Sequence, residues 1–429
     1  MENLFSLKEN GTTVKTEITA GVTTFLTMVY IFVVNPVILS SAGVPFNQVF
    51  MATIISAVAG TLYMALFAKY PIAIAPGMGM NAYFASIVAT RGIPYQVVFG
   101  AVFLAGLLFT LLSFTRLRET LIEAIPNPLK YGITAGIGLF IAFIGLKMSG
   151  IIVANPSNLV SLGDLHAPAT ALTLAGLFIT LALMSRKING ALFIGMVVTA
   201  IIGFFTGLLK FNGIIAPPPM PVFFDIDVAG VFTYGLYTTV FAFLLVTIFD
   251  TTGTMIGVAE QAGLMKEGKL PRAKSALMAD AVSTVVGSMF GTSPCTAYIE
   301  SSTGVAAGGR TGLTALVAAG LFLVSMFFSP AISAFSNLSA ITAPVLIIVG
   351  CFMMEGLAKI DWKTFDDAFP AFLIILSMPL TSSIATGISI GFIAYPVMKL
   401  VSGKAKKVHP LLYVFGVIFA LQMIFFPAH

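Results

Sequence analysis

Long apolar runs separated by short polar segments follow one another along almost the whole chain. Each run is close to the roughly 20 residues that an α-helix needs to cross the hydrocarbon core of a bilayer. The runs are continuous rather than alternating between apolar and polar residues, which disfavours a membrane β-barrel. The pattern predicts fourteen membrane-spanning helices, near residues 18–39, 47–68, 72–90, 94–115, 129–149, 169–184, 190–208, 231–258, 274–290, 293–309, 312–329, 341–358, 366–380 and 383–400, with a further apolar segment at 410–426.

The composition supports the same class. Only 9% of the 429 residues are charged and 58% are hydrophobic, whereas soluble domains average about 25% charged residues. We therefore expect an all-α polytopic protein in contact with a lipid bilayer. The net charge of +5 does not indicate a nucleic-acid partner, because the basic residues lie in short connections. Cys295 and Cys351 form no metal or disulfide pattern, and no cofactor or metal is expected.

Lysine and arginine are concentrated in every second connection, and the alternate connections hold few basic residues besides Arg91 and Lys210. By the positive-inside rule, this predicts a multi-pass protein of the cell membrane with a cytoplasmic N-terminus. Segment 410–426 follows the fourteen predicted spans and does not fit the alternation of basic and non-basic connections. It is either an extra span or an interfacial helix. The basic connections contain Lys69; Arg116, Arg118 and Lys130; Arg186 and Lys187; Lys266, Lys269, Arg272 and Lys274; Lys359 and Lys363; and Lys399, Lys404, Lys406 and Lys407.

A proline-rich, acidic stretch at 211–229 divides the chain nearly in half. We interpret it as a linker between two repeats, residues 1–210 and 230–429. Each half holds seven predicted spans, and an odd number gives the halves opposite orientations in the membrane. Inverted repeats of this kind are common among secondary transporters.

Two segments do not fit plain spanning helices: "YPIAIAPGMGMNAYFASIVATRG" and "GTSPCTAYIESSTGVAAGGRTG". Each begins with a proline-containing piece and ends as a short apolar helix at an arginine. Arg91 lies ten residues after Asn81, as Arg310 does after Glu300. Paired, interrupted segments in corresponding positions indicate a transporter binding site, where half-helix N-termini offer unpaired N–H groups. The alternative is that proline and glycine merely kink two helices.

Two carboxylates lie deep in apolar surroundings. Asp250 follows a long apolar run and Glu300 lies at the expected start of the second half-helix. A carboxylate at the bilayer centre costs about 2.5–3.5 kcal/mol on insertion scales, so such residues usually have a function. A carboxyl that binds both a proton and a ligand suits a proton-driven transporter of a small polar solute. The alternative for Asp250 is a structural acid bonded to Thr251, Thr252 or Thr254.

Enzyme activity is not expected. "GVAAGGRT" has the glycine spacing of a phosphate-binding loop, but Arg310 stands where that motif requires lysine. The sequence shows neither a nucleophile with a base nor a metal-ligand cluster. An integral membrane enzyme is therefore an unlikely alternative function.

"PGMGMNAYFA", "FDTTGTMIGVA" and "GTSPCTAYIESSTGVAAGGRTGLTAL" together resemble the nucleobase–cation symporter family, in particular its AzgA-type purine permeases. The resemblance covers nearly the whole chain. It implies import of hypoxanthine, guanine or adenine by proton symport, an elevator-type movement and a possible homodimer. It also implies fourteen helices in two inverted seven-helix repeats, with interrupted spans 3 and 10. A core domain would comprise 18–115 and 231–329, and a gate domain 129–208 and 341–400.

The resemblance further implies a purine-binding site. Asp250 matches the acid of span 8, Glu300 the acid of span 10 and Asn81 the polar residue of span 3. Proton coupling is expected at Glu300 and Asp250. Thr247 stands where many relatives carry a second acid. An anion transporter of the same fold is the alternative, although two acids disfavour it. The neighbouring residues expected to bind the base are Gly79, Ala82, Tyr83, Ile299 and Ser301.

Overall fold

The computed structural model describes residues 2–115, 124–211, 213–265 and 270–425. Arg116, Arg118, Lys266 and Lys269 of the basic connections lie outside this part, as does residue 426 of the last apolar segment. Nine helices in the described part are long and apolar enough to cross a membrane. The chain is a multi-pass membrane protein, as the hydrophobic pattern predicts.

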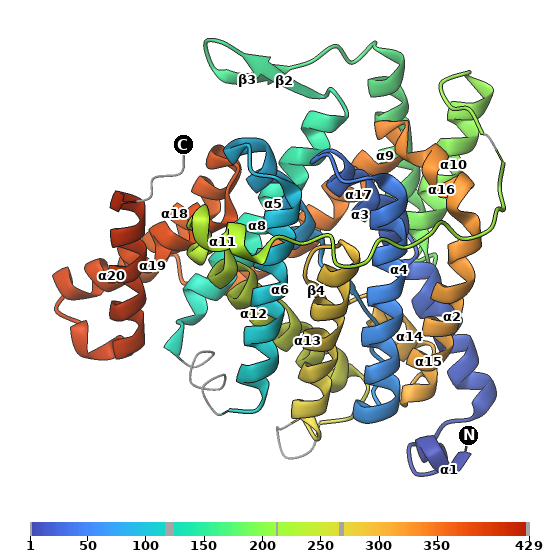
Figure 1. Ribbon diagram of the computed structural model, residues 1–429, viewed down its shortest axis with the longest axis horizontal. Helices are drawn as coiled ribbons and strands as arrows, with labels where there is room; N and C mark the ends of the chain where they lie inside the picture. Colours follow the sequence, from blue (N-terminus) through green and yellow to red (C-terminus); the bar gives the residue numbers. More distant parts are fainter. Residues whose placement is uncertain (1, 116–123, 212, 266–269, 426–429) are drawn as a thin grey trace.

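The first half contains ten α-helical or π-helical elements and three strands in the described residues. The interrupted third span appears as a short strand followed by a half-helix, and a β-hairpin protrudes at the upper edge of Figure 1. The elements are α1 (Glu2–Phe5), α2 (Val14–Met28), α3 (Ile31–Ser40), α4 (Phe46–Tyr63) with the π-turn η1 (Met64–Ala68), β1 (Ile74–Pro76), α5 (Met78–Arg91), α6 (Tyr95–Ser113), α8 (Asn127–Met148), the hairpin β2 (Ile152–Asn155) and β3 (Leu159–Leu162), α9 (Pro168–Ser185) and α10 (Ala191–Phe205).

The second half repeats this order, and its tenth span is again a strand followed by a half-helix. The elements are α11 (Val228–Thr233), α12 (Tyr237–Gln261), α13 (Ala273–Phe290), β4 (Cys295–Ala297), α14 (Ser301–Ala306), α15 (Gly312–Ser325), η2 (Met326–Phe328), α16 (Ser329–Ser336), α17 (Ser339–Phe352), η3 (Met353–Lys359), α18 (Phe365–Thr381), α19 (Ile384–Val401), η4 (Ala405–Lys407) and α20 (Pro410–Phe425).

The fold class predicted from the sequence is confirmed. β1 and β4 occupy matching positions in the two halves and pair antiparallel, with Ile74 opposite Ala297 and Pro76 opposite Cys295. Helices α2, α4, α13 and α15 pack against one another, while α8 packs on α17 and α18. These two groups correspond to the core and gate of the inverted-repeat fold. The residue limits assigned to the core, gate and linker remain predictions.

The eighth span begins later than expected. The hydrophobic pattern places its start at 231, but the chain first forms the short helix α11, and α12 starts at Tyr237. The Asp227 side chain accepts a hydrogen bond from the N–H of Gly230 at 2.8 Å and caps α11. Because this cap fixes a separate helical turn, residues 231–233 end α11 and residues 234–236 form the turn before α12.

A buried glutamate joins the first helix to the second half of the chain. Glu17 of α2 is fully buried and accepts hydrogen bonds from the backbone N–H groups of Arg310, Thr311 and Thr314 at 2.9, 3.3 and 3.1 Å. The hydroxyls of Thr311 and Thr314 also donate to it, at 2.8 and 2.7 Å. The carboxylate thus serves as the N-terminal cap of α15 from another helix.

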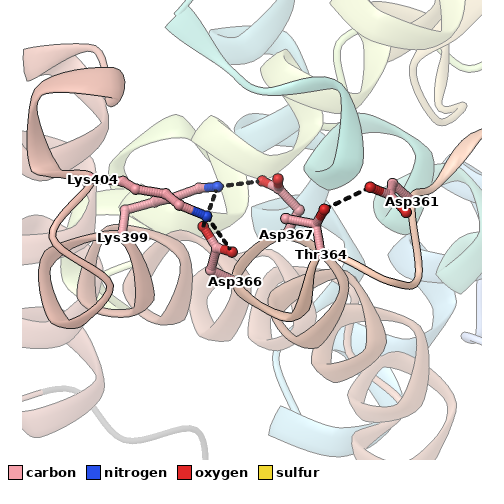
Figure 2. Close-up of polar contacts among 6 residues, drawn as sticks. All are labelled: Asp361, Thr364, Asp366, Asp367, Lys399 and Lys404. Carbon is pink, nitrogen blue, oxygen red and sulfur yellow. Dashed lines mark hydrogen bonds and ion pairs between the residues drawn. The ribbon is translucent and has the colours of Figure 1, made fainter.

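An ion cluster joins the start of α18 to the end of α19 (Figure 2). Lys399 of α19 is 5% exposed and lies 2.6 Å from Asp366 Oδ2 and 2.8 Å from Asp367 Oδ1. Lys404 lies 2.9 Å from the other oxygen of Asp366. The aspartates occupy the first turn of α18, where negative charge is favourable. The cluster therefore holds the start of α18 against the end of α19.

The last apolar segment forms α20, which packs along α19 at one edge of the molecule (Figure 1). Phe415 and Phe419 contact Phe241 of α12, with ring centroids 4.9 and 5.5 Å apart, and both also pack on Phe392 of α19. Gln422 donates a hydrogen bond to Thr238 of α12. Residues 410–425 of the last apolar segment, whose role the sequence leaves open, thus form a helix packed against α12 and α19.

The cap on α15 makes a testable prediction. Glu17→Ala leaves the N–H groups of Arg310 and Thr311 and the Thr311 hydroxyl without this acceptor, which should cost about 3 kcal/mol or more. We expect a clearly lower melting temperature of the purified protein in detergent. Glu9→Ala, at an exposed position before the first span, is the control and should melt like the wild type. Equal melting temperatures for both variants would show that the cap does not stabilise the fold.

Candidate functional site

The two interrupted spans meet through their non-helical backbone. The β1–β4 ladder is extended at both ends, because Gly77 N–H donates to Pro294 O at 2.9 Å and Tyr298 N–H donates to Ala73 O at 3.0 Å. The Tyr298 hydroxyl donates to Pro76 O at 2.5 Å. Non-helical backbone is tolerated among membrane-spanning helices only where such partners satisfy it. Each span therefore supplies the hydrogen bonds that the other lacks.

The half-helix α5 approaches α8 very closely. A Cβ atom on Gly79, in the first turn of α5, would lie 2.4 Å from Ile137 Cγ2 of α8. Only glycine fits at this distance, so Gly79 brings the backbone of the core against the gate. Gly79 also lines a cavity of about 10 Å³ with Asp250, Met80 and Ile137, which we call the Asp250 cavity.

Asp250 lies within α12 and faces this narrow cavity. The Thr251 hydroxyl donates to Asp280, and the Thr252 hydroxyl donates to Ile248 O at 2.6 Å. The hydroxyl protons of these two neighbours thus serve acceptors other than Asp250. Thr247, one turn earlier, is buried, and its hydroxyl has no hydrogen-bond partner among the described residues.

Glu300 lies immediately before α14 and points to a different cavity. Its Oε1 accepts a hydrogen bond at 2.5 Å from the hydroxyl of Tyr30, the residue that precedes α3. The side chain lines a cavity of about 300 Å³ between α2, α14 and the α9–α10 connection, which we call the Glu300 cavity. Thr27, Lys187 and Thr303 also line it. The structure therefore places the two predicted acids in separate cavities.

Asn81 lies one turn into α5 and is fully buried. Neither Nδ2 nor Oδ1 has a hydrogen-bond partner among the residues that the structure describes. A buried amide without partners costs about 1–3 kcal/mol, and native proteins rarely keep one without a function. Asn81 is therefore the strongest local indication of a ligand at the half-helix start.

The other predicted site residues differ in their surroundings. Tyr83 is buried, its ring lies 5.0 Å from that of Phe243, and its hydroxyl lies 3.5 Å from Thr239 Oγ1. Ala82 is also buried. The Ser301 hydroxyl oxygen accepts from Ala73 N–H at 3.0 Å, so this side chain is engaged in joining α14 to β1. Ile299 is 52% exposed and lines none of the three cavities described here.

A third cavity of about 310 Å³ lies at the far end of α5. We call it the Arg91 cavity; it lies between α5, the start of α12, the α18–α19 connection and α20. Both larger cavities adjoin an interrupted span and the connection between the last two spans of a repeat. The Arg91 cavity lies at the end of α5, however, whereas the Glu300 cavity lies at the start of α14. Their principal polar lining residues are Tyr83, Arg91, Ser389 and Gln422 in one, and Lys187, Glu300 and Thr303 in the other.

Sequence reasoning missed two contributors. Asp280 of α13 is fully buried, and its Oδ2 accepts from the Thr251 hydroxyl and from Ala297 N–H at 3.3 Å. A carboxylate inside the apolar run 274–290 was visible in the sequence and could have indicated it. Tyr30 lies 270 residues from Glu300 and gives no sequence signal. Both residues connect the site to its supporting helices.

The fold and the paired half-helices define a membrane transporter with inverted repeats. The model of the permease family matches residues 15–390, and the chain belongs to that family. It is 61% identical to the guanine/hypoxanthine permease PbuO of Bacillus subtilis, over 98% of this chain and 99% of that protein. It is 46% identical to the adenine permease AdeP of Escherichia coli, over 100% of this chain and 97% of that protein.

Solved structures support the architecture. The transmembrane domain of a cyanobacterium bicarbonate transporter, BicA, superposes with a TM-score of 0.68, over 87% of this chain and 97% of that chain. The sequences are 17% identical, so this likeness concerns the fold. The family match and the curated relatives, which are named permeases, identify the chain as a permease.

The unpaired amide of Asn81 makes a second prediction. Asn81→Leu keeps the branching of the side chain but removes the unpaired polar atoms, so it should stabilise the ligand-free protein by about 1 kcal/mol. Asn35→Leu is the matched control, because Asn35 is also fully buried but donates to Thr53 and Thr292 at 2.7 and 2.8 Å. We expect melting in detergent to shift upward for the first variant and downward for the second. Similar destabilisation of both would show that Asn81 has a structural role.

Proposed function

We propose that the protein imports purine nucleobases (hypoxanthine, guanine or adenine) across the cell membrane by proton symport. The observation that carries the proposal is the fully buried, unpaired Asn81 at the start of one interrupted span, together with the half-buried acids Glu300, at the start of the other, and Asp250 of α12. It occurs in a chain 61% identical to a protein named guanine/hypoxanthine permease and 46% identical to one named adenine permease. The base that the protein prefers is left open by these names.

Purines fit the chemistry of these residues. Their ring N–H groups donate hydrogen bonds to carboxylates, and their ring nitrogens and carbonyl oxygens accept from amide N–H groups. The start of α5 offers such N–H groups, as helix N-termini do. At the start of α14, by contrast, the N–H groups of Ser301, Ser302 and Thr303 already donate to backbone carbonyl oxygens. A planar ring also stacks on an aromatic side chain, and Tyr83 and Tyr298 lie beside the half-helices. Gly79, Ala82, Ile299 and Ser301 complete the proposed binding segment.

Transport requires the core and gate to move relative to each other. The Asp250 cavity of about 10 Å³ has room for no more than a water molecule. A base can therefore reach Asp250 only when α5 moves away from Ile137 of α8. We propose an elevator-type displacement of the core (18–115 and 231–329) against the gate (129–208 and 341–400). The cavities at opposite ends of the site support such alternating access.

Glu300 and Asp250 are the proposed proton carriers. A carboxyl that must be protonated before it releases or accepts a ligand couples the movement of the proton to the movement of the ligand. The Tyr30 hydroxyl donates a hydrogen bond to Glu300 Oε1 at 2.5 Å and holds this carboxyl in place. Thr247 supplies no further acid, so the proposed coupling rests on these two carboxyls. The N-terminus is proposed to be cytoplasmic, and a homodimer follows from the family resemblance.

The alternative is an anion transporter of the same fold, since BicA is named a bicarbonate transporter. An anion requires a cation at the half-helix start. Arg310 instead turns its Nη1 to Val305 O and Gly309 O, at 2.6 and 2.7 Å, within the end of its own half-helix segment. The Arg310 guanidinium thus binds carbonyl oxygens rather than pointing toward Glu300. The site therefore favours a solute that donates N–H groups over an anion.

Uptake of labelled bases tests the proposal directly. We expect Asp250→Asn and Glu300→Gln each to reduce purine uptake about 10- to 100-fold, because each loses a charged hydrogen-bond acceptor. The assay uses cells lacking their own purine permeases, with surface expression measured in parallel and unlabelled bases, including uracil, as competitors. Glu260→Gln, at an exposed position in the last turn of α12, is the control. Wild-type uptake in both site variants would contradict the site assignment.

Proton coupling has its own test in proteoliposomes. We expect a protonophore to abolish accumulation of the base against its gradient, because the proton gradient supplies the work. Glu300→Gln should lose accumulation yet keep exchange of labelled for unlabelled base at saturating concentration, since exchange needs no net proton movement. Accumulation that persists without a proton gradient would exclude proton symport while leaving purine transport intact.

A further inference from the structure

The Arg91 cavity is separate from the proposed binding residues at Asp250 but adjoins them. Tyr83 lines the Arg91 cavity, whereas Gly79 and Met80, about one turn earlier on α5, line the Asp250 cavity. Tyr83 thus stands at the boundary between the two. In the proposed orientation, the end of α5 faces the outside of the cell. A solute arriving from outside would meet the Arg91 cavity before it reaches Asp250.

The size and polarity of this cavity suit a small ring compound. Its volume of about 310 Å³ lies within the range of roughly 300–1,000 Å³ that is usual for small-molecule pockets. Hydroxyl groups line much of it, and most of their hydrogens are already used inside the protein. Donations to backbone carbonyl oxygens come from Ser86, Thr90, Thr381 and Ser389.

The hydroxyl groups that line the cavity can therefore mainly accept further hydrogen bonds rather than donate them. The oxygen atoms of these hydroxyls keep lone pairs for N–H donors. Gln422 donates through Nε2 to Thr238, which leaves its carbonyl oxygen without a hydrogen bond from any described residue. A ligand with several ring or exocyclic N–H groups matches this part of the cavity.

Arg91 is the one cation among the residues that line this cavity. No hydrogen bond or ion pair of its guanidinium to another described residue is found in the structure. A guanidinium presents a planar fork of N–H donors and pairs in bidentate fashion with adjacent acceptors. The O6 and N7 atoms of a 6-oxopurine are such a pair, and arginine binds that edge of guanine in nucleic acids.

Resting on the proposed function, we propose that the Arg91 cavity is an entry subsite for 6-oxopurines. Arg91 donates to O6 and N7, while the hydroxyl oxygens and the Gln422 carbonyl accept from the ring N–H groups. Adenine carries an amino group in place of O6, and this donor faces the donors of Arg91. The subsite therefore selects hypoxanthine and guanine over adenine by an unfavourable contact as well as a favourable one.

The test is a comparison of kinetic constants for the three bases. Arg91→Gln should raise the KM for hypoxanthine and guanine about tenfold, the loss expected for one bidentate contact. Its maximal rate should stay close to that of the wild type, because Asp250 and Glu300 are unchanged. The KM for adenine, or its inhibition constant where uptake is too slow, should stay the same or fall. Lys210→Gln is the control, because it removes an exposed cation from another connection of the same face.

The outcomes separate the two proposals. An equal rise in KM for all three bases, or no change for any, overturns the subsite while purine transport stands. Failure of the wild type to take up any purine overturns both. Arg91→Lys keeps the charge but not the planar fork, so it should behave like Arg91→Gln. Recovery of the wild-type KM by lysine would show that charge alone is needed and would refute the bidentate contact.

A second measurement does not depend on transport rates. Met423→Cys, combined with Cys351→Ser to remove the exposed native thiol, places a thiol at the cavity without removing a proposed contact to the base. A membrane-impermeant thiol reagent added from outside should modify it, and hypoxanthine should slow the modification more than adenine does at equal concentration. Equal protection by both bases, or none by either, would refute an oxopurine subsite at this position.

Discussion

Backbone hydrogen bonding in a medium without water is the constraint on which this structure depends. Two spans leave the helical conformation among apolar helices, and unpaired N–H and C=O groups there would each cost several kcal/mol. The antiparallel pairing of β1 with β4 removes most of that cost. It also fixes where α5 and α14 begin. The positions of Asn81 and Glu300 are thus set by a ladder of only a few residues.

Supporting contacts explain why this short ladder is stable. Glu17 holds the segment after α14 against α2, and Asp280 accepts from both α12 and β4. Each of these buried carboxylates joins elements distant in sequence and so holds the core helices together. In the gate, the ion cluster of Asp366, Asp367 and Lys399 does the same for α18 and α19. Between the two groups of helices, the contact of Gly79 with Ile137 is purely steric, whereas Ser86 of α5 donates a hydrogen bond to Ser382 O of the α18–α19 connection.

Much of this arrangement could be predicted from the sequence, for identifiable reasons. Proline and glycine at matching offsets from Asn81 and Glu300 indicated the interrupted spans, because such residues rarely recur in register by chance. The hydrophobic pattern could not show that Asp250 and Glu300 line different cavities, since that depends on how closely α5 packs on α8. It also could not place α20, because an apolar run of 16 residues suits either a surface helix or a packed one. Phe415 and Phe419 decide this through contacts with Phe241, far away in the sequence.

The inverted repeats have a consequence for the direction of transport. Two cavities of about 310 and 300 Å³ adjoin the interrupted spans, one at the end of α5 and the other at the start of α14. For a carrier that a solute can enter through either cavity, the fold alone does not set the direction of flow. Net movement is then decided by concentrations on either side and by whatever gradient is coupled to the carrier. The entrances differ in their side chains, with Arg91 at one and Lys187 and Glu300 at the other, so any asymmetry between loading and unloading resides in those few residues.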